Sequence, residues 1–212
     1  MKMKNKCRDY LKEMRITHYL KNGLVFAPVI FSGNLGNIKF LSISFWGFLC
    51  FSLMCSAVYI INDIKDIEKD RLHEEKKNRP IAAGRISVNE AIVLSMVLLV
   101  VSILFSFEIF KISGTINGFM VWIAYLGVNV FYSVFGGKKV ALLDVCLLSL
   151  GFYLRVLYGG VITGIPISMW LYLVVITGAF YLGFGKRRNE LVKNSNSTRV
   201  SDGILREVRT AL

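Results

Sequence analysis

The sequence predicts an all-α protein that crosses a membrane several times as a bundle of helices. Apolar residues make up 54% of its 212 residues. The charged residues fall in blocks between long uncharged stretches, which is typical of integral membrane proteins. Because a spanning helix needs about 20 apolar residues, each long uncharged stretch is a candidate span.

Six candidate spans follow one another along the chain, at residues 20–31, 40–61, 91–107, 112–135, 140–162 and 165–184. The first is shorter than a spanning helix normally is. We retain it because an even number of crossings must separate the basic N-terminus from the basic segment at 62–87. We therefore expect one membrane bundle over 1–184 and a basic cytoplasmic loop or tail over 185–212.

Lysine and arginine gather in alternate connecting segments. Seven lie in residues 1–21, seven in 62–87, two in 136–139 and seven in 186–212. This asymmetry follows the positive-inside rule and places the N-terminus in the cytoplasm. We expect a multi-pass protein of the cell membrane with its site facing the cytoplasm. Membrane orientation also accounts for the net charge of +12, so no nucleic-acid partner is expected. The sequence leaves a homo-oligomer open.

A group of carboxylates follows the second expected span, at Asp63, Asp66 and Asp70. If the helix continues beyond the membrane surface, steps of about 100° per residue place all three within roughly a 60° arc. Like charges this close repel unless a cation compensates them, and oxygen ligands suit Mg²⁺. Asn62 adds a carbonyl oxygen. The alternative is a solvated helix end whose acidic groups pair with neighbouring lysine and arginine.

Two motifs here carry a family resemblance. The pattern N-D-x-x-D-x-x-x-D at 62–70, followed by N-R-P-I-A-A-G at 78–84, resembles the UbiA superfamily of membrane prenyltransferases. The resemblance implies that Asn62, Asp63, Asp66 and Asp70 hold Mg²⁺ and that the three aspartates are catalytic. In the branch that prenylates aromatic rings, a second aspartate-rich motif belongs near 181–190. This sequence has a basic cluster there, and basic side chains bind phosphate directly.

The G-K-R-R-x-E-L pattern at 185–191 resembles the decaprenyl-phosphate phosphoribosyltransferase branch of that superfamily. Transfer of 5-phosphoribose from phosphoribosyl diphosphate to a polyprenyl phosphate, with release of diphosphate, is the reaction this implies. Asp144 follows Lys138 at that branch's spacing, and we assign both to the donor or metal site. Arg155 lies deeper, where a structural ion pair and a substrate contact are both open. The expected substrate-binding residues are Asn62, Arg79, Tyr132, Lys138, Asp144, Arg155, Lys186, Arg187 and Arg188.

Two other functions remain open. An aromatic or quinone-precursor prenyltransferase would use the same aspartates to ionise a prenyl diphosphate, although the missing second acidic motif argues against it. Members of the family typically carry further helices after the sixth. We therefore expect a C-terminally shortened bundle, for which an inactive membrane fragment is the third hypothesis.

Overall fold

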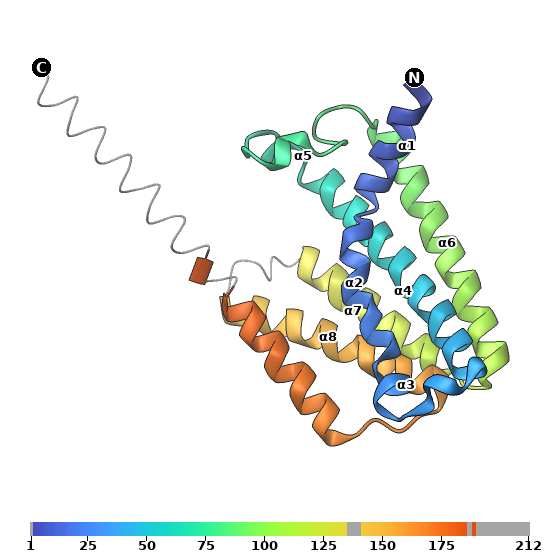
Figure 1. Cartoon of the computed structure of the whole chain (residues 1–212). Helices are drawn as coiled ribbons and strands as arrows, with labels where there is room; N and C mark the ends of the chain where they lie inside the picture. The colour runs from blue at the N-terminus through green and yellow to red at the C-terminus, as the bar shows by residue number, and fades with distance from the viewer. Residues whose placement is uncertain (1, 135–140, 186–187, 190–212) are drawn as a thin grey trace, which may run out of the picture.

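The computed structural model describes residues 2–134, 141–185 and 188–189, and every regular element in these ranges is a helix (Figure 1). The prediction of an all-α fold is therefore confirmed. The longest helices are α4 (Ile38–Lys65), α6 (Val88–Ser113) and α8 (Ala141–Thr163). α4, α6 and the Leu143–Thr163 part of α8 are long and apolar enough to cross a membrane. They contain most of the second, third and fifth expected spans.

The fourth and sixth expected spans form α7 (Asn117–Val134) and a shorter apolar helix, Met169–Gly185. The first expected span is not one helix. It is divided into α2 (Tyr19–Asn22), the 3₁₀ turn η2 (Gly23–Phe26) and α3 (Ala27–Phe31). Gly23 and Pro28 oppose a continuous α-helix, since glycine is flexible and proline has no backbone N–H.

α4 and α6 form the main helix pair, and they run side by side in opposite directions (Figure 1). Small polar side chains join them at close range. The Ser95 hydroxyl donates to the carbonyl of Ala57 at 3.1 Å, and the Ser102 hydroxyl donates to that of Cys50 at 2.8 Å. Small residues that allow close backbone approach are typical of helix contacts in membranes.

The N-terminal helix α1 (Lys2–Glu13) docks at the end of the bundle where α4 finishes and α6 begins (Figure 1). Lys6 pairs with Glu90, and Arg85 pairs with Asp9 at 3.0 Å. The basic N-terminus and the basic loop after α4 therefore lie at the same end of the molecule.

Candidate functional site

The carboxylate motif lies where α4 ends. α4 stops at Asp66, whose backbone angles (φ −96°, ψ 9°) leave the helical range, and a separate short helix, α5 (Ile67–Arg71), follows. The expectation of one helix reaching Asp70 is therefore wrong. Aspartate favours helix ends because its side chain competes for nearby backbone groups.

Arg79 joins two of the three aspartates despite this break. Its Nη1 donates to Asp63 Oδ1 at 2.8 Å and to Asp70 Oδ2 at 2.6 Å. Both carboxylates are buried, with 5% and 4% exposure. Arg79, which was predicted to bind substrate, also links the two carboxylates through these hydrogen bonds.

The segment after Arg79 explains how that side chain is positioned. Ile81 and Ala82 are buried, and Ile81 packs in an apolar cluster with Ala57 and Ile60 of α4. The turn closes at Gly84, whose φ of 71° suits glycine. The R-P-I-A-A-G motif thus folds as a buried turn that directs Arg79 toward the aspartates.

Arg15 is a second guanidinium at the site, and our sequence reasoning missed it. Its Nη2 donates to both carboxylate oxygens of Asp63, at 2.5 and 2.7 Å. Its backbone is left-handed (φ 52°, ψ 49°), a conformation that costs a non-glycine residue roughly 1–3 kcal/mol and is common at functional sites. The only signal in the sequence is its place in the basic stretch before the first expected span.

Asp66 behaves differently from its two neighbours. Its side chain is 29% exposed and lies 3.9 Å from the ammonium of Lys69, while Arg71 pairs with Glu68 at 3.2 Å. The alternative of a solvated helix end describes these two pairs. It does not describe Asp63 and Asp70, whose partners come from outside the helix.

A fourth carboxyl group, that of Glu13, borders Asp63 from the end of α1. Burial, and next the neighbouring charge of Asp63, raise the pKa of Glu13 to about 7. Its side chain is 2% exposed, and Oε1 is buried without a hydrogen-bond partner. Glu13 could not be identified from the sequence either, because only the docking of α1 brings it to the site.

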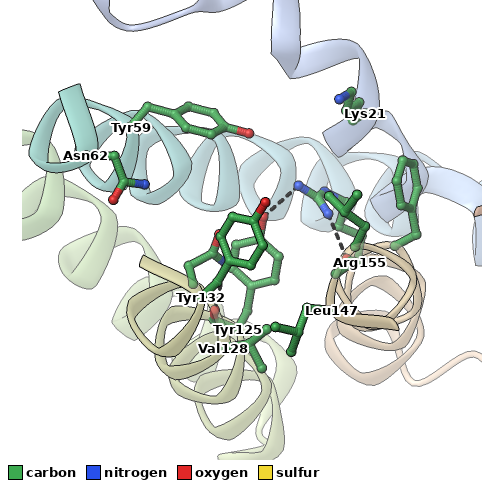
Figure 2. A pocket seen from close by; sticks show the side chains of 12 residues that line it. Lys21, Tyr59, Asn62, Tyr125, Val128, Tyr132, Leu147 and Arg155 are labelled. Atoms are coloured by element: carbon green, nitrogen blue, oxygen red, sulfur yellow. Dashed lines mark hydrogen bonds between the residues drawn. The ribbon is translucent and has the colours of Figure 1, made fainter. Parts of the chain in front are cut away.

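A cavity of about 120 Å³, partly open to solvent, is shown in Figure 2. It lies near the carboxylate cluster formed by Glu13, Asp63 and Asp70. Its walls come from α2, α4, α7 and α8. Asn62, Tyr132 and Arg155, three of the residues predicted to bind substrate, all line it, together with Lys21. Two cationic side chains and no carboxylate are among its lining residues, so the cavity is suited to an anion.

Arg155 is the most buried cation in this cavity, with 5% exposure. Its guanidinium donates to Asn22 Oδ1 at 2.8 Å and to the Gly151 carbonyl at 2.7 Å. It also donates to the Tyr125 hydroxyl at 2.6 Å (Figure 2). No ion pair found within the described ranges includes Arg155. The ion-pair alternative is therefore not observed there, and contact with substrate stays the prediction for this residue.

The remaining residues predicted to bind substrate differ in burial, and three of them are not described by the structure. Asp144 is fully buried and accepts a hydrogen bond from the Tyr132 hydroxyl, which lines the cavity. Arg188 is exposed. Lys138, Lys186 and Arg187 lie outside the residues that the structure describes.

Tyr59 connects the carboxylate cluster with the cavity. Its side chain lines the cavity, and the Arg15 guanidinium lies 4.9 Å from the centre of its ring. The two features are therefore neighbours at the same end of α4.

Nowhere in 2–134, 141–185 and 188–189 are three histidine, cysteine or acidic side chains placed to hold a metal ion by themselves. Mg²⁺ at a phosphate site usually takes only one or two carboxylates and completes its shell with phosphates and water. Glu13, Asp63 and Asp70 are three buried carboxyls, and the guanidiniums of Arg15 and Arg79 donate to Asp63 and Asp70 but not to Glu13. Glu13 interacts with Asp63, and its Oε1 is buried without a hydrogen-bond partner, so this set of oxygen donors fits a divalent cation.

Comparisons with known proteins agree on one family. The model of the UbiA prenyltransferase family matches residues 24–187. Decaprenyl-phosphate phosphoribosyltransferase of Mycolicibacterium smegmatis is 36% identical over 89% of the chain, and that of Corynebacterium glutamicum is 35% identical over 89%. The chain spans 58% and 56% of the lengths of these two relatives.

Solved structures show the same fold. A digeranylgeranylglyceryl phosphate synthase has a TM-score of 0.68 at 21% identity, over 86% of this chain and 61% of that one. A UbiA homologue from Archaeoglobus fulgidus, bound to GPP and Mg²⁺, has a TM-score of 0.64 at 23% identity, over 81% and 60%.

Proposed function

The chain belongs to the UbiA prenyltransferase family, and from this membership we propose that it transfers 5-phosphoribose from phosphoribosyl diphosphate to a polyprenyl phosphate. The observation that carries the proposal is the pairing of a carboxylate cluster with a cationic, aromatic-lined cavity at one end of α4. The names of the relatives from M. smegmatis and C. glutamicum support this choice of substrates.

The cluster would receive the diphosphate of the donor. Bound Mg²⁺ would neutralise the charge that develops on this leaving group. Asp63 and Asp70 would hold the cation through their buried oxygens. Arg15 and Arg79 already lie against these carboxylates and would orient diphosphate oxygens, since guanidinium binds phosphate in a bidentate manner.

The cavity would bind a phosphate monoester through Lys21 and Arg155. Both substrates carry such a group, the donor as its 5-phosphate and the lipid as its head group. In the reaction, the bond between the anomeric carbon and diphosphate breaks while a new bond forms to the lipid phosphate oxygen. That oxygen is already anionic, so positioning, and not a strong general base, is what these residues must supply.

The proposed setting is the plasma membrane, with the carboxylate cluster facing the cytoplasm, where phosphoribosyl diphosphate is available. The basic residues of α1 and of the loop after α4 support this orientation, because they lie at the same end as the cluster.

A transfer assay in nanodiscs tests the substrates. The chain is supplied with Mg²⁺, a polyprenyl phosphate and labelled phosphoribosyl diphosphate, and label is followed into the lipid phase. Label in the lipid supports the proposal. Transfer only from labelled geranyl diphosphate to an aromatic acceptor would replace it with a prenyltransferase. No transfer from either donor would contradict the proposal and favour the inactive-fragment hypothesis.

A further inference from the structure

The Glu13 carboxyl is buried at the site, and neither Arg15 nor Arg79 donates a hydrogen bond to it. In the part of the chain that the structure describes, both hydrogen bonds that Arg15 gives to a carboxylate go to Asp63, and those of Arg79 go to Asp63 and Asp70. Glu13 is 2% exposed, and its Oε1 has no hydrogen-bond partner. A buried acceptor in this state is costly unless something else satisfies it.

The place of Glu13 is fixed by several contacts of the N-terminal arm. Arg85 pairs with Asp9 at 3.0 Å, and Lys12 donates to the carbonyl of Asn78 at 3.4 Å. The Ser56 hydroxyl of α4 donates to the carbonyl of Met14 at 2.7 Å. These contacts lie on both sides of Glu13 along the chain and place its carboxyl within hydrogen-bonding reach of Asp63. The arm is held so that an acidic group enters a site that already contains two others.

We propose that Glu13 is a further ligand of the divalent cation held by Asp63, so that the N-terminal arm completes the metal site. A cation between the two carboxyls would satisfy the unpartnered oxygen and remove the repulsion between like charges. Two carboxylates with phosphate oxygens and water form a normal Mg²⁺ shell. This inference rests on the metal site of the proposed function, and it adds a residue from α1 to it.

Direct metal binding tests this assignment. Mn²⁺ replaces Mg²⁺ as the probe because it also prefers oxygen ligands in octahedral geometry and is observed by electron paramagnetic resonance. Free Mn²⁺ is measured while the full chain is titrated in detergent with inorganic diphosphate present. We expect Glu13→Gln to weaken Mn²⁺ binding at least about tenfold. The matched control, Glu108→Gln, alters an exposed carboxyl near the far end of α6 and should leave binding unchanged.

Glutamine also separates metal ligation from the alternative, a neutral Glu13 that hydrogen-bonds to Asp63. Because Gln resembles the neutral acid, that alternative predicts unchanged Mn²⁺ affinity in Glu13→Gln, and this result would overturn the inference. Asp63→Asn serves as the reference variant. If it too leaves binding unchanged, the metal site of the proposed function fails; if only Asp63→Asn weakens binding, Glu13 alone is excluded. Thermal unfolding without metal should show that Glu13→Gln is folded, since it removes a like charge.

Discussion

Arg155 is a buried cation in an apolar helix, and it lines the cavity that we propose binds phosphate. Its guanidinium is held by an amide oxygen, a carbonyl and a tyrosine hydroxyl, all of them neutral groups. A buried cation held in this way keeps its full positive charge available to an anion that enters the cavity. An arginine that served only the fold would be expected to pair with a carboxylate at this depth.

Replacing Arg155 by glutamine should weaken binding of one phosphate-bearing substrate. A charge-assisted hydrogen bond is worth roughly 1.5–3 kcal/mol, so KM should rise at least about tenfold. KM is measured separately for phosphoribosyl diphosphate and for the polyprenyl phosphate. The substrate whose KM rises is the one whose phosphate occupies the cavity. The control is Lys111→Gln, which removes an exposed cation on another helix, α6. Unchanged KM for both substrates in folded protein would contradict a phosphate site here.

His18 gives the stability of the folded chain a pH dependence of known sign. Burial first, and then the nearby charges of Lys21 and Arg15, lower the pKa of His18 from its usual 6.5. Its Nδ1 is buried without a partner, so the folded protein resists protonation there. The unfolded chain takes up the proton more readily. The contribution of neutral His18 to folding stability is therefore complete at pH values above the pKa of His18 in the unfolded chain. It is lost as the pH falls below that value.

We expect wild-type protein in detergent to lose more thermal stability than His18→Gln between pH 7.5 and 5.5. Glutamine cannot become charged, so its variant lacks this proton-linked loss. The measurement is the apparent Tm of both proteins across that range. Parallel curves for the two proteins would show that His18 does not titrate differently on folding.

Among the helices, hydropathy predicted the positions of α4, α6 and α8 well, because each must present an apolar surface over most of its length. It could not predict the interruption of the first expected span. Nor could spacing alone predict the helix break at Asp66, where local side-chain competition outweighs helical periodicity. The prediction grouped three aspartates because it assumed one continuous helix. In the structure, Arg79 joins only Asp63 and Asp70.

The presence of Glu13 and Arg15 at the site could not be predicted from the sequence for a different reason. Arg15 and Glu13 lie about 50 residues before Asp63 in sequence, as the 48-residue separation of the Arg15–Asp63 pair shows. Only the docking of α1 across the end of α4 brings them together. The R-P-I-A-A-G motif, in contrast, could be located from sequence, and the structure adds the reason for it: a buried turn that positions Arg79.

The contact between α8 and η2 gives a prediction about packing. A Cβ atom added to Gly159 would lie 2.1 Å from the backbone oxygen of Val25, a contact that no side-chain rotation relieves. Gly159→Ala should therefore destabilise the bundle by roughly 1–3 kcal/mol or more, as overpacking does. Gly127→Ala in α7, where nothing lies within 4 Å, should be neutral or mildly stabilising. Apparent Tm in detergent distinguishes the two variants, and equal values would argue against this close helix contact.

In the molecule as a whole, the basic segments that the structure describes lie at one end of the helix bundle. α1, α5 and the basic loop after α4 lie at one end of the bundle, while α3 and the start of α4 lie at the other (Figure 1). The carboxylate cluster belongs to the basic end. If that end faces the cytoplasm, a water-soluble diphosphate reaches the cluster directly.

Cysteine labelling tests this orientation. His73→Cys and Asn34→Cys place thiols at opposite ends of α4, in chains whose two exposed native thiols are removed by Cys7→Ser and Cys146→Ser. With a maleimide that does not cross membranes, His73→Cys should react in inverted vesicles and Asn34→Cys in right-side-out vesicles. The opposite pattern would reverse the orientation, and labelling of both from one side would contradict a spanning α4.

The central claim is that the buried carboxylates at the end of α4 support metal-dependent transfer. The most direct measurement is the rate of phosphoribosyl transfer to polyprenyl phosphate as Mg²⁺ is varied, in wild type, Asp63→Asn and the Glu108→Gln control. We expect that EDTA abolishes transfer and that Glu108→Gln resembles wild type. We also expect a loss in Asp63→Asn of at least about a hundredfold, equivalent to roughly 2.7 kcal/mol of transition-state stabilisation. Transfer by Asp63→Asn at the wild-type rate, with the same Mg²⁺ dependence, would contradict the central claim.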